Sequence, residues 1–193
     1  MKGFNSLFPD IKINISEEDS NSVKQEVRDG ILDFGVVMLP ADEKEFDITP
    51  FVYEELALFV HYTHRLAHRE KVDLSELKNE NFILFNQELI YNLIIQKCLG
   101  AGFRPRIAYE ISEWGFISEM IGENIGISIC PKPISKKMNQ DLIKVISIEN
   151  PSIPWNLGFI SKKRKQLHLQ YVNLSSIFLN YYLLNYDMGL APF

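Results

Sequence analysis

The chain has 193 residues, of which 46% are hydrophobic and 12% aromatic. This is enough for one large domain or two small ones with packed cores, and it excludes a disordered chain. The formal net charge of -5 argues against nucleic-acid binding by this chain alone, because phosphate recognition needs a basic face. The N-terminus lacks the apolar core of a signal peptide, and no apolar run reaches membrane-spanning length.

Apolar periodicity and the positions of Gly, Pro and helix-cap residues predict alternating strands and helices. Up to residue 62, the predicted elements are a helix end at 4–8, a strand at 11–15 with one solvated face, a helix at 20–29 capped by Ser20, a central strand at 32–38, a solvated acidic loop at 41–47, and one or two strands at 51–62. Gly30 is expected to close the first complete helix.

The rest of the chain continues this alternation. The predicted elements are a helical turn at 73–77, strands at 82–85, 106–110, 127–130, 142–148 and 155–161, and helices at 88–101, from 112 onward, at 135–138 and at 167–184. The basic cluster at 162–165 has four charges without interleaved aromatic residues, so we interpret it as a solvated loop rather than a nucleic-acid contact.

The stretch from Ser112 to Pro131 organises the predicted fold. Ser112 is a favourable N-cap for a helix whose buried stripe would comprise Phe116, Ile117, Met120 and Ile121. A turn bracketed by Gly122 and Gly126 then leads to a short buried strand that Pro131 ends. This order is typical of a parallel α/β sheet, in which ligands bind beside the strand ends. Ser112 is therefore either a ligand contact or only a helix cap.

The helix predicted at 88–101 carries more apolar surface than one core-facing stripe needs. Its predicted core stripe consists of Leu89, Leu93 and Leu99, flanked by Ile90 and Ile94. Apolar surface continues around the helix at Tyr91, Ile95 and Cys98. We expect this surplus to mediate self-association, and the alternative is that these are scattered surface residues of a monomer.

His61, His64 and His68 have the spacing of metal ligands on a helix, but their segment is strand-like at the start and loop-like at the end. We therefore predict that they bind no metal, with His61 on a strand and the other two on an exposed loop. Cys98 and Cys130 lack metal-ligand spacing and are interpreted as reduced core residues of a cytoplasmic protein. We expect no cofactor, because no dinucleotide-binding, P-loop or zinc-protease motif occurs.

Five motifs follow one another in a fixed order. They are Phe8-Pro9-Asp10 before the alternating strand, GILDFGVV at 30–37, ELALFV at 55–60 with HRLA at 64–67, AGFRPR at 101–106, and GENIGISICP at 122–131. In order and spacing they resemble the effector-binding domain of LysR-type transcriptional regulators. The resemblance extends from Phe4 to Leu184 and so covers nearly the whole chain.

The resemblance implies an α/β, two-lobed periplasmic-binding-protein-like fold (type 2), in which each lobe is a central mixed sheet flanked by helices. The first lobe would comprise residues 1–54 and 164–193 and the second residues 55–163, with a hinge near 54–58 and 159–163. A small effector would bind in the cleft between the lobes. Two subunits would pair antiparallel as a homodimer.

Matched residue by residue, the family's cleft falls on positions in both predicted lobes. The effector-binding residues are expected to be Ser16, Glu17, Met38 and Leu39 in the first lobe, and Asn86, Gln87, Ser112, Glu113, Trp114 and Pro131 in the second. Helix N-termini favour an anionic group, so we prefer a carboxylate effector.

The sequence departs from the family's pattern in three respects. The N-terminal helix-turn-helix and linker helix are absent, so DNA binding is expected only through a region that this chain lacks. The domain's usual opening strand is also absent, which indicates an excised fragment or a degraded reading frame. His64-Arg65 replaces the family's usual His-Pro at an expected exposed turn.

The expected function is that of a regulatory sensor, in which effector binding closes the lobes and the closure is transmitted to a DNA-binding region. The alternative is an extracytoplasmic solute-binding receptor of the same fold, which the missing signal peptide disfavours. An enzyme is a third possibility, and the absence of a nucleophile–base pair or a carboxylate pair argues against it.

Overall fold

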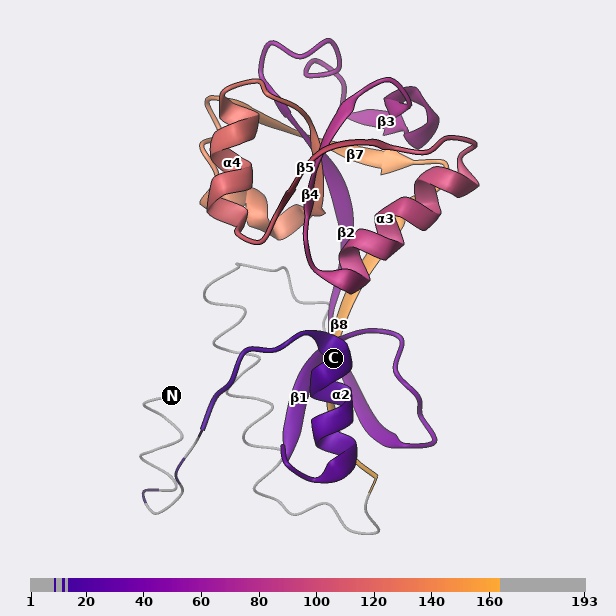
Figure 1. Ribbon diagram of the computed structural model, residues 1–193, viewed down its shortest axis with the longest axis vertical. Coiled ribbons are helices and arrows are strands. Elements are labelled where there is room, and N and C mark those ends of the chain that lie inside the picture. The colour runs from indigo at the N-terminus through magenta and orange to yellow at the C-terminus, as the bar shows by residue number, and fades with distance from the viewer. Residues whose placement is uncertain (1–8, 10–11, 13, 164–193) are drawn as a thin grey trace. The chain divides into compact units, whose positions relative to one another are not determined.

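The computed structural model describes residues 9, 12 and 14–163 (Figure 1). The chain divides into two compact units: the first ends at Tyr53 and resumes at Asn156, and the second spans Glu54–Trp155. Strands β2 (Phe46–His61) and β8 (Ile153–Lys162) each have residues in both units. The boundary between Trp155 and Asn156 precedes residue 159, where the second segment of the hinge is predicted to begin. The lobes and the hinge as functional parts stay a prediction.

In the first unit, helix α2 (Ser20–Asp29) packs against strand β1 (Phe34–Met38), which pairs antiparallel with β8. Val23 and Val27 bury the apolar face of the helix in a small core. Gly35 permits this close packing, because a Cβ at that position would overlap the Val23 side chain. The helix therefore lies directly on the strand.

The start of α2 differs from the prediction. Its N-cap is Asp19, whose carboxylate accepts the backbone N–H groups of Asn21 at 2.8 Å and Ser22 at 3.2 Å. Asp19 has extended backbone angles, whereas Ser20 is already helical, so the prediction of Ser20 as the cap was wrong by one residue. Gly30 closes the helix in the left-handed conformation, at φ 77°, as predicted.

The second unit contains two groups of strands. In one, β2 pairs antiparallel with β6 (Ser128–Pro131) and with β7 (Ile143–Glu149), and β7 pairs in parallel with β3 (Lys71–Asp73). The other is the parallel pair of β4 (Asn81–Phe85) and β5 (Arg106–Ile111). Parallel and antiparallel pairs occur together, so the sheet is mixed.

Two helices flank the parallel pair. Helices α3 (Glu88–Gly100) and α4 (Trp114–Gly122) both contact β4, and Figure 1 shows them to either side of β4 and β5. Short 3-10 turns occupy Leu74–Leu77 and Lys132–Lys137. A buried core that includes Phe59, Ile83 and Ile121 lies between α4 and the strands.

Both helices are rotated or shifted relative to the prediction. In α3 the buried residues are Ile90, Ile94 and Cys98, whereas Leu99 is 49% exposed, so the predicted core stripe was wrong by about one position. Helix α4 has Glu113 rather than Ser112 as its N-cap residue. Of its predicted stripe, Ile117, Met120 and Ile121 are buried but Phe116 is 51% exposed.

Several other predictions, mostly in the N-terminal part, differ from the structure or fall outside the described residues. Ile15, expected on an inward strand face, lies outside any strand and is 61% exposed, while Ile11 and Ile13 are outside the described residues. Strand β1 stands at one end of the described strand order rather than at its centre. The predicted acidic loop ends earlier, because Phe46 is buried and opens β2. The helices predicted at 4–8 and 167–184 are also outside the described residues.

Candidate functional site

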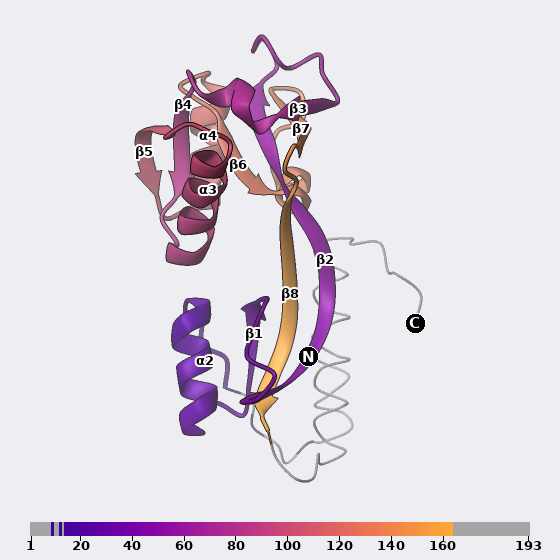
Figure 2. The ribbon, with the colours of Figure 1, turned by 90° about the vertical axis from the view of Figure 1, so that its right-hand side faces the viewer.

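Three strands of the second unit end at one edge, which we call the strand-end edge. In the β4–β5 pair, Phe85 lies opposite Ile111 in parallel register, and the ladder continues one step further because the Asn86 N–H donates to the Ile111 carbonyl at 2.8 Å. Strand β6 approaches β4 from its other side through a parallel bridge between Phe82 and Ile127. Figure 2 shows β4 and β5 side by side. The carboxyl ends of all three strands therefore face the same way.

Helices α3 and α4 begin at this edge, directly after β4 and β5. Their N-cap residues are Gln87 and Glu113, and neither side chain makes a capping hydrogen bond. The backbone N–H groups of each first turn have no partner within the helix and are therefore available to water or to a ligand. Asn86, Ser112 and Glu113 are exposed, and Gln87 is half-buried. The structure thus brings these predicted site residues together.

Partly exposed apolar residues lie among these polar ones. The Phe85 and Trp114 rings are stacked, with centroids 3.9 Å apart and planes inclined by 16°. Phe85, Ile111, Trp114 and Ile134 are each half-buried and pack against the core beneath. The sequence prediction included only Trp114 of these four. The position of Phe85 and Ile111 as the last residues of their strands was the signal that could have identified them.

Strand β6 is held beside β4 by a buried serine. The Ser128 side chain is fully buried, and its hydroxyl donates to the Ile83 carbonyl at 2.6 Å. The Cys130 thiol donates to the Ser128 hydroxyl at 3.2 Å, and burial raises the pKa of that thiol to about 12. Pro131 ends the strand and is buried, so it bounds the strand-end edge and offers no exposed polar group.

The predicted residues of the first unit also lie near a helix start. The Met38 N–H donates to the Ser20 hydroxyl at 3.1 Å, which ties the end of β1 to the first turn of α2. Leu39 donates its N–H to the Asn156 carbonyl at 2.9 Å and packs over Gly158. Ser16 and Glu17 are exposed in the segment before α2. That these residues join those of the second unit around one effector stays a prediction.

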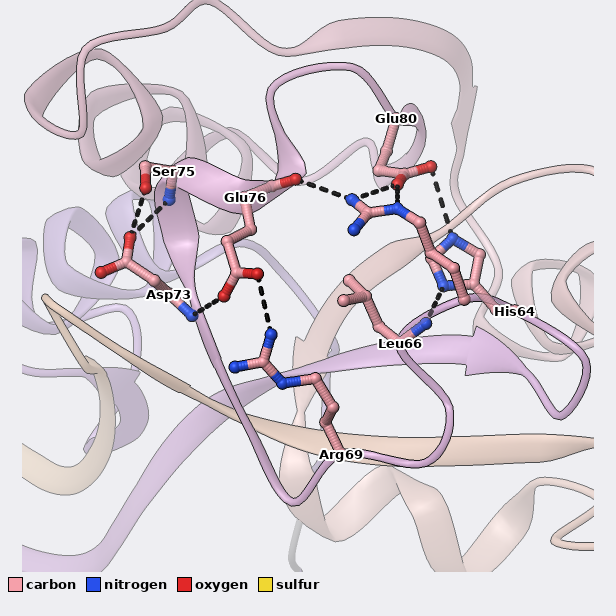
Figure 3. A network of polar contacts seen from close by, with 8 residues as sticks. His64, Leu66, Arg69, Asp73, Ser75, Glu76 and Glu80 are labelled. Atoms are coloured by element: carbon pink, nitrogen blue, oxygen red, sulfur yellow. Dashed lines mark hydrogen bonds and ion pairs between the residues drawn. The ribbon is translucent and has the colours of Figure 1, made fainter.

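Two of the three histidines, His61 and His64, have local polar partners, and Figure 3 shows His64 beside Glu80. His61 ends β2, and its Nδ1 lies 2.7 Å from the Thr63 hydroxyl. His64 Nε2 lies 3.3 Å from a carboxylate oxygen of Glu80 and is half-buried rather than exposed as predicted, whereas His68 is exposed. Across the described ranges, no three His, Cys, Asp or Glu side chains are grouped as a metal ion would require. That the histidines bind no metal stays a prediction.

Comparison with known proteins identifies the relatives of the chain. The family model of the LysR substrate binding domain matches residues 1–176. The uncharacterised HTH-type transcriptional regulator YwbI of Bacillus subtilis (strain 168) is 42% identical over 165 residues, which are 85% of this chain and 55% of that protein. The chain thus spans about half the length of the curated relatives it matches.

Two solved structures show the same architecture. The C-terminal domain of a probable LysR family regulator from Rhodococcus sp. RHA1 is 19% identical with a TM-score of 0.76, over 93% of this chain and 89% of that one. The effector binding domain of QuiR in complex with shikimate is 21% identical with a TM-score of 0.73, over 93% and 87%. The predicted α/β periplasmic-binding-protein-like fold (type 2) is thereby confirmed.

Proposed function

Since the chain belongs to the LysR substrate-binding domain family, we propose that it is the ligand-sensing part of a longer transcriptional regulator. The family is a regulatory domain and the relatives are named as transcriptional regulators, so the chain is not an enzyme. DNA binding would reside in a region outside this sequence, and the regulator would work in the cytoplasm. In the described residues, no helix is long and apolar enough to cross a membrane.

The observation that carries this proposal is the strand-end edge. Three strand ends and two helix starts meet there, and both N-cap side chains leave the N–H groups of the first turn unbonded. Such an arrangement offers fixed hydrogen-bond donors at the positive ends of two helix dipoles. A small effector with a carboxylate group would accept these donors.

We place the effector between the two lobes, in contact with the predicted residues of both. The first-lobe contacts would come from Ser16, Glu17, Met38 and Leu39, and the second-lobe contacts from Asn86, Gln87, Ser112, Glu113, Trp114 and Pro131. An effector that touches both lobes binds the closed form more tightly than the open form. That difference in affinity is what shifts the population toward closure and signals binding.

A thermal-shift screen tests the effector class. Carboxylic acids and their primary amides form matched pairs of equal size, and we expect only the acids to raise the unfolding temperature of the chain. Ser112→Pro removes a hydroxyl and stiffens the approach to α4, and should weaken this shift, whereas the exposed Ser152→Ala should not. Amides that stabilise the chain as strongly as their acids would contradict the carboxylate preference.

We further propose that the chain forms a homodimer through α3. The outer side of this helix keeps apolar surface, because Leu89, Tyr91, Leu93 and Ile95 are only half-buried and Leu99 is exposed. A stable dimer should bury at least about 1,000 Å² in total. Ile95→Glu should yield a monomer in light scattering, and the neighbouring exposed Gln96→Glu should leave the dimer intact. A wild-type chain that is monomeric at tens of micromolar would contradict the proposal.

A further inference from the structure

We propose that Trp114, stacked on Phe85, determines the specificity of the effector site and selects a carboxylate whose body is flat and unsaturated. This inference rests on the proposed function and names the chemical class of its effector. The aromatic pair stands where the two helix starts meet, since Phe85 ends β4 and Trp114 opens α4. A ligand anchored by the N–H groups of α4 thus lies next to an aromatic surface.

The composition of the strand-end edge supports a flat apolar ligand body. Phe85, Ile111, Trp114 and Ile134 come from four different segments and are all half-buried at this edge. Covering such apolar surface stabilises the complex, and a strongly hydroxylated ligand would lose this contribution. The polar side chains Asn86 and Ser112 lie on the adjoining turns, where they can orient the anionic end.

The stacked geometry favours a planar group over a puckered one. Aromatic rings attract other π-systems in offset-stacked or edge-to-face arrangements, which contribute about 0.5–1.5 kcal/mol beyond the buried area. A saturated ring of the same size buries a similar area but lacks this attraction between π-systems. The expected preference for the planar ligand is therefore about threefold to tenfold in Kd.

The test uses the chain's own fluorescence. The sequence has two tryptophans, so Trp155→Phe leaves Trp114 as the reporter. Benzoate, cyclohexanecarboxylate and benzamide are titrated against this variant of the full chain. We expect benzoate to change the Trp114 emission and to bind about threefold to tenfold more tightly than cyclohexanecarboxylate, and benzamide to bind more weakly than either acid.

Substitutions separate recognition from packing. Trp114→Leu should bring the two acids to equal affinity, measured by calorimetry, whereas Trp114→Phe should keep most of the preference. Phe116→Leu, an exposed aromatic residue on the same helix, is the matched control and should leave the preference unchanged. The Phe variant keeps the test valid even where the Leu variant unfolds.

The outcomes also separate this inference from the proposed function. Equal binding of benzoate and cyclohexanecarboxylate by the wild-type chain would overturn the specificity role of Trp114 and leave the carboxylate site standing. A preference for benzoate that persists in Trp114→Leu would likewise overturn the specificity role of Trp114 and leave the carboxylate site standing. A chain that binds neither acid overturns both the inference and the proposed carboxylate site.

Discussion

Replacing Ser128 by alanine should destabilise the second unit because this hydroxyl joins β6 to β4. Ser128 is fully buried and donates to the Ile83 carbonyl at 2.6 Å, and it accepts the Cys130 thiol at 3.2 Å. The Cys130 thiol is protonated at neutral pH, since burial raises its pKa to about 12. Ser128→Ala thus deprives a buried acceptor and a buried donor of the same partner.

The expected loss in the free energy of unfolding is about 1–3 kcal/mol, the usual cost of leaving a buried polar group unsatisfied. Most of it arises at the Ile83 carbonyl, because a thiol is a weak donor and contributes little. Alanine fills nearly the same volume as serine, so the cavity left by the substitution adds little to the loss in the free energy of unfolding. The upper end of the range applies if no water reaches the site.

Urea unfolding followed by Trp114 fluorescence, in the Trp155→Phe background, reports on the unit that contains Ser128. The slope of the free energy against urea should stay constant while the midpoint falls. Ser152→Ala is the matched control, because this serine is exposed, and its effect should stay within about 0.5 kcal/mol. A loss below about 0.5 kcal/mol for Ser128→Ala would refute the reasoning.

Three further predictions concern the helix start, a close backbone contact and the histidines. Asp19→Ala should cost about 1 kcal/mol of stability. Hydrogen bonds from Ser22 and Asn21 lower the pKa of Asp19, so this contribution should be full above pH 3.8 and disappear as the pH falls through the lowered value, which a pH series of melting curves would detect. Gly126→Ala should destabilise the second unit more than Gly115→Ala, because a Cβ at Gly126 would lie 2.6 Å from the Asn81 carbonyl oxygen while Gly115 has open space; equal melting temperatures would contradict this. Elemental analysis of the purified chain should find no stoichiometric zinc, and zinc that is lost in His64→Ala would overturn the prediction.

The order of strands and helices in the second unit could be predicted because each boundary carries a local signal. Residues 82–85 of strand β4 form an uninterrupted apolar run, and Gly100 and Gly102 mark the end of α3. The predicted strand before Pro131 is present as β6, shifted by one residue. These boundary signals depend on the local sequence alone and not on which helices and strands pack together.

The orientation of α3 could not be predicted for a physical reason. A leucine is followed directly by an isoleucine at Leu89–Ile90 and again, four residues later, at Leu93–Ile94. Two adjacent faces of the helix are therefore about equally apolar. Periodicity alone cannot choose between them. The choice falls to tertiary packing against β4, which buries the isoleucines and Cys98.

The cap residues were mispredicted for a related reason. Asp19 and Ser20 are both good caps, as is Ser112, and residue type alone does not say at which position the backbone turns helical. Hydrogen bonds of the neighbouring strand decide this at α4, where β5 continues to Ile111 and the helix begins only at Trp114. Ser112 is left exposed, outside the helix and free of a capping role.

These errors rotate or shift the helices but leave the candidate site almost unchanged. A helix that is rotated about its axis still begins at the same residue, and the start of each helix is fixed by the end of the strand before it. The Asn86–Ile111 hydrogen bond holds the two strand ends together regardless of which face of α3 is buried. The rotation does decide which apolar residues remain outside, and so it moves the proposed dimer surface toward Leu89, Leu93 and Leu99. The proposed site therefore depends on where strands end, which local sequence signals indicate, whereas the proposed interface depends on helix phase, which they do not.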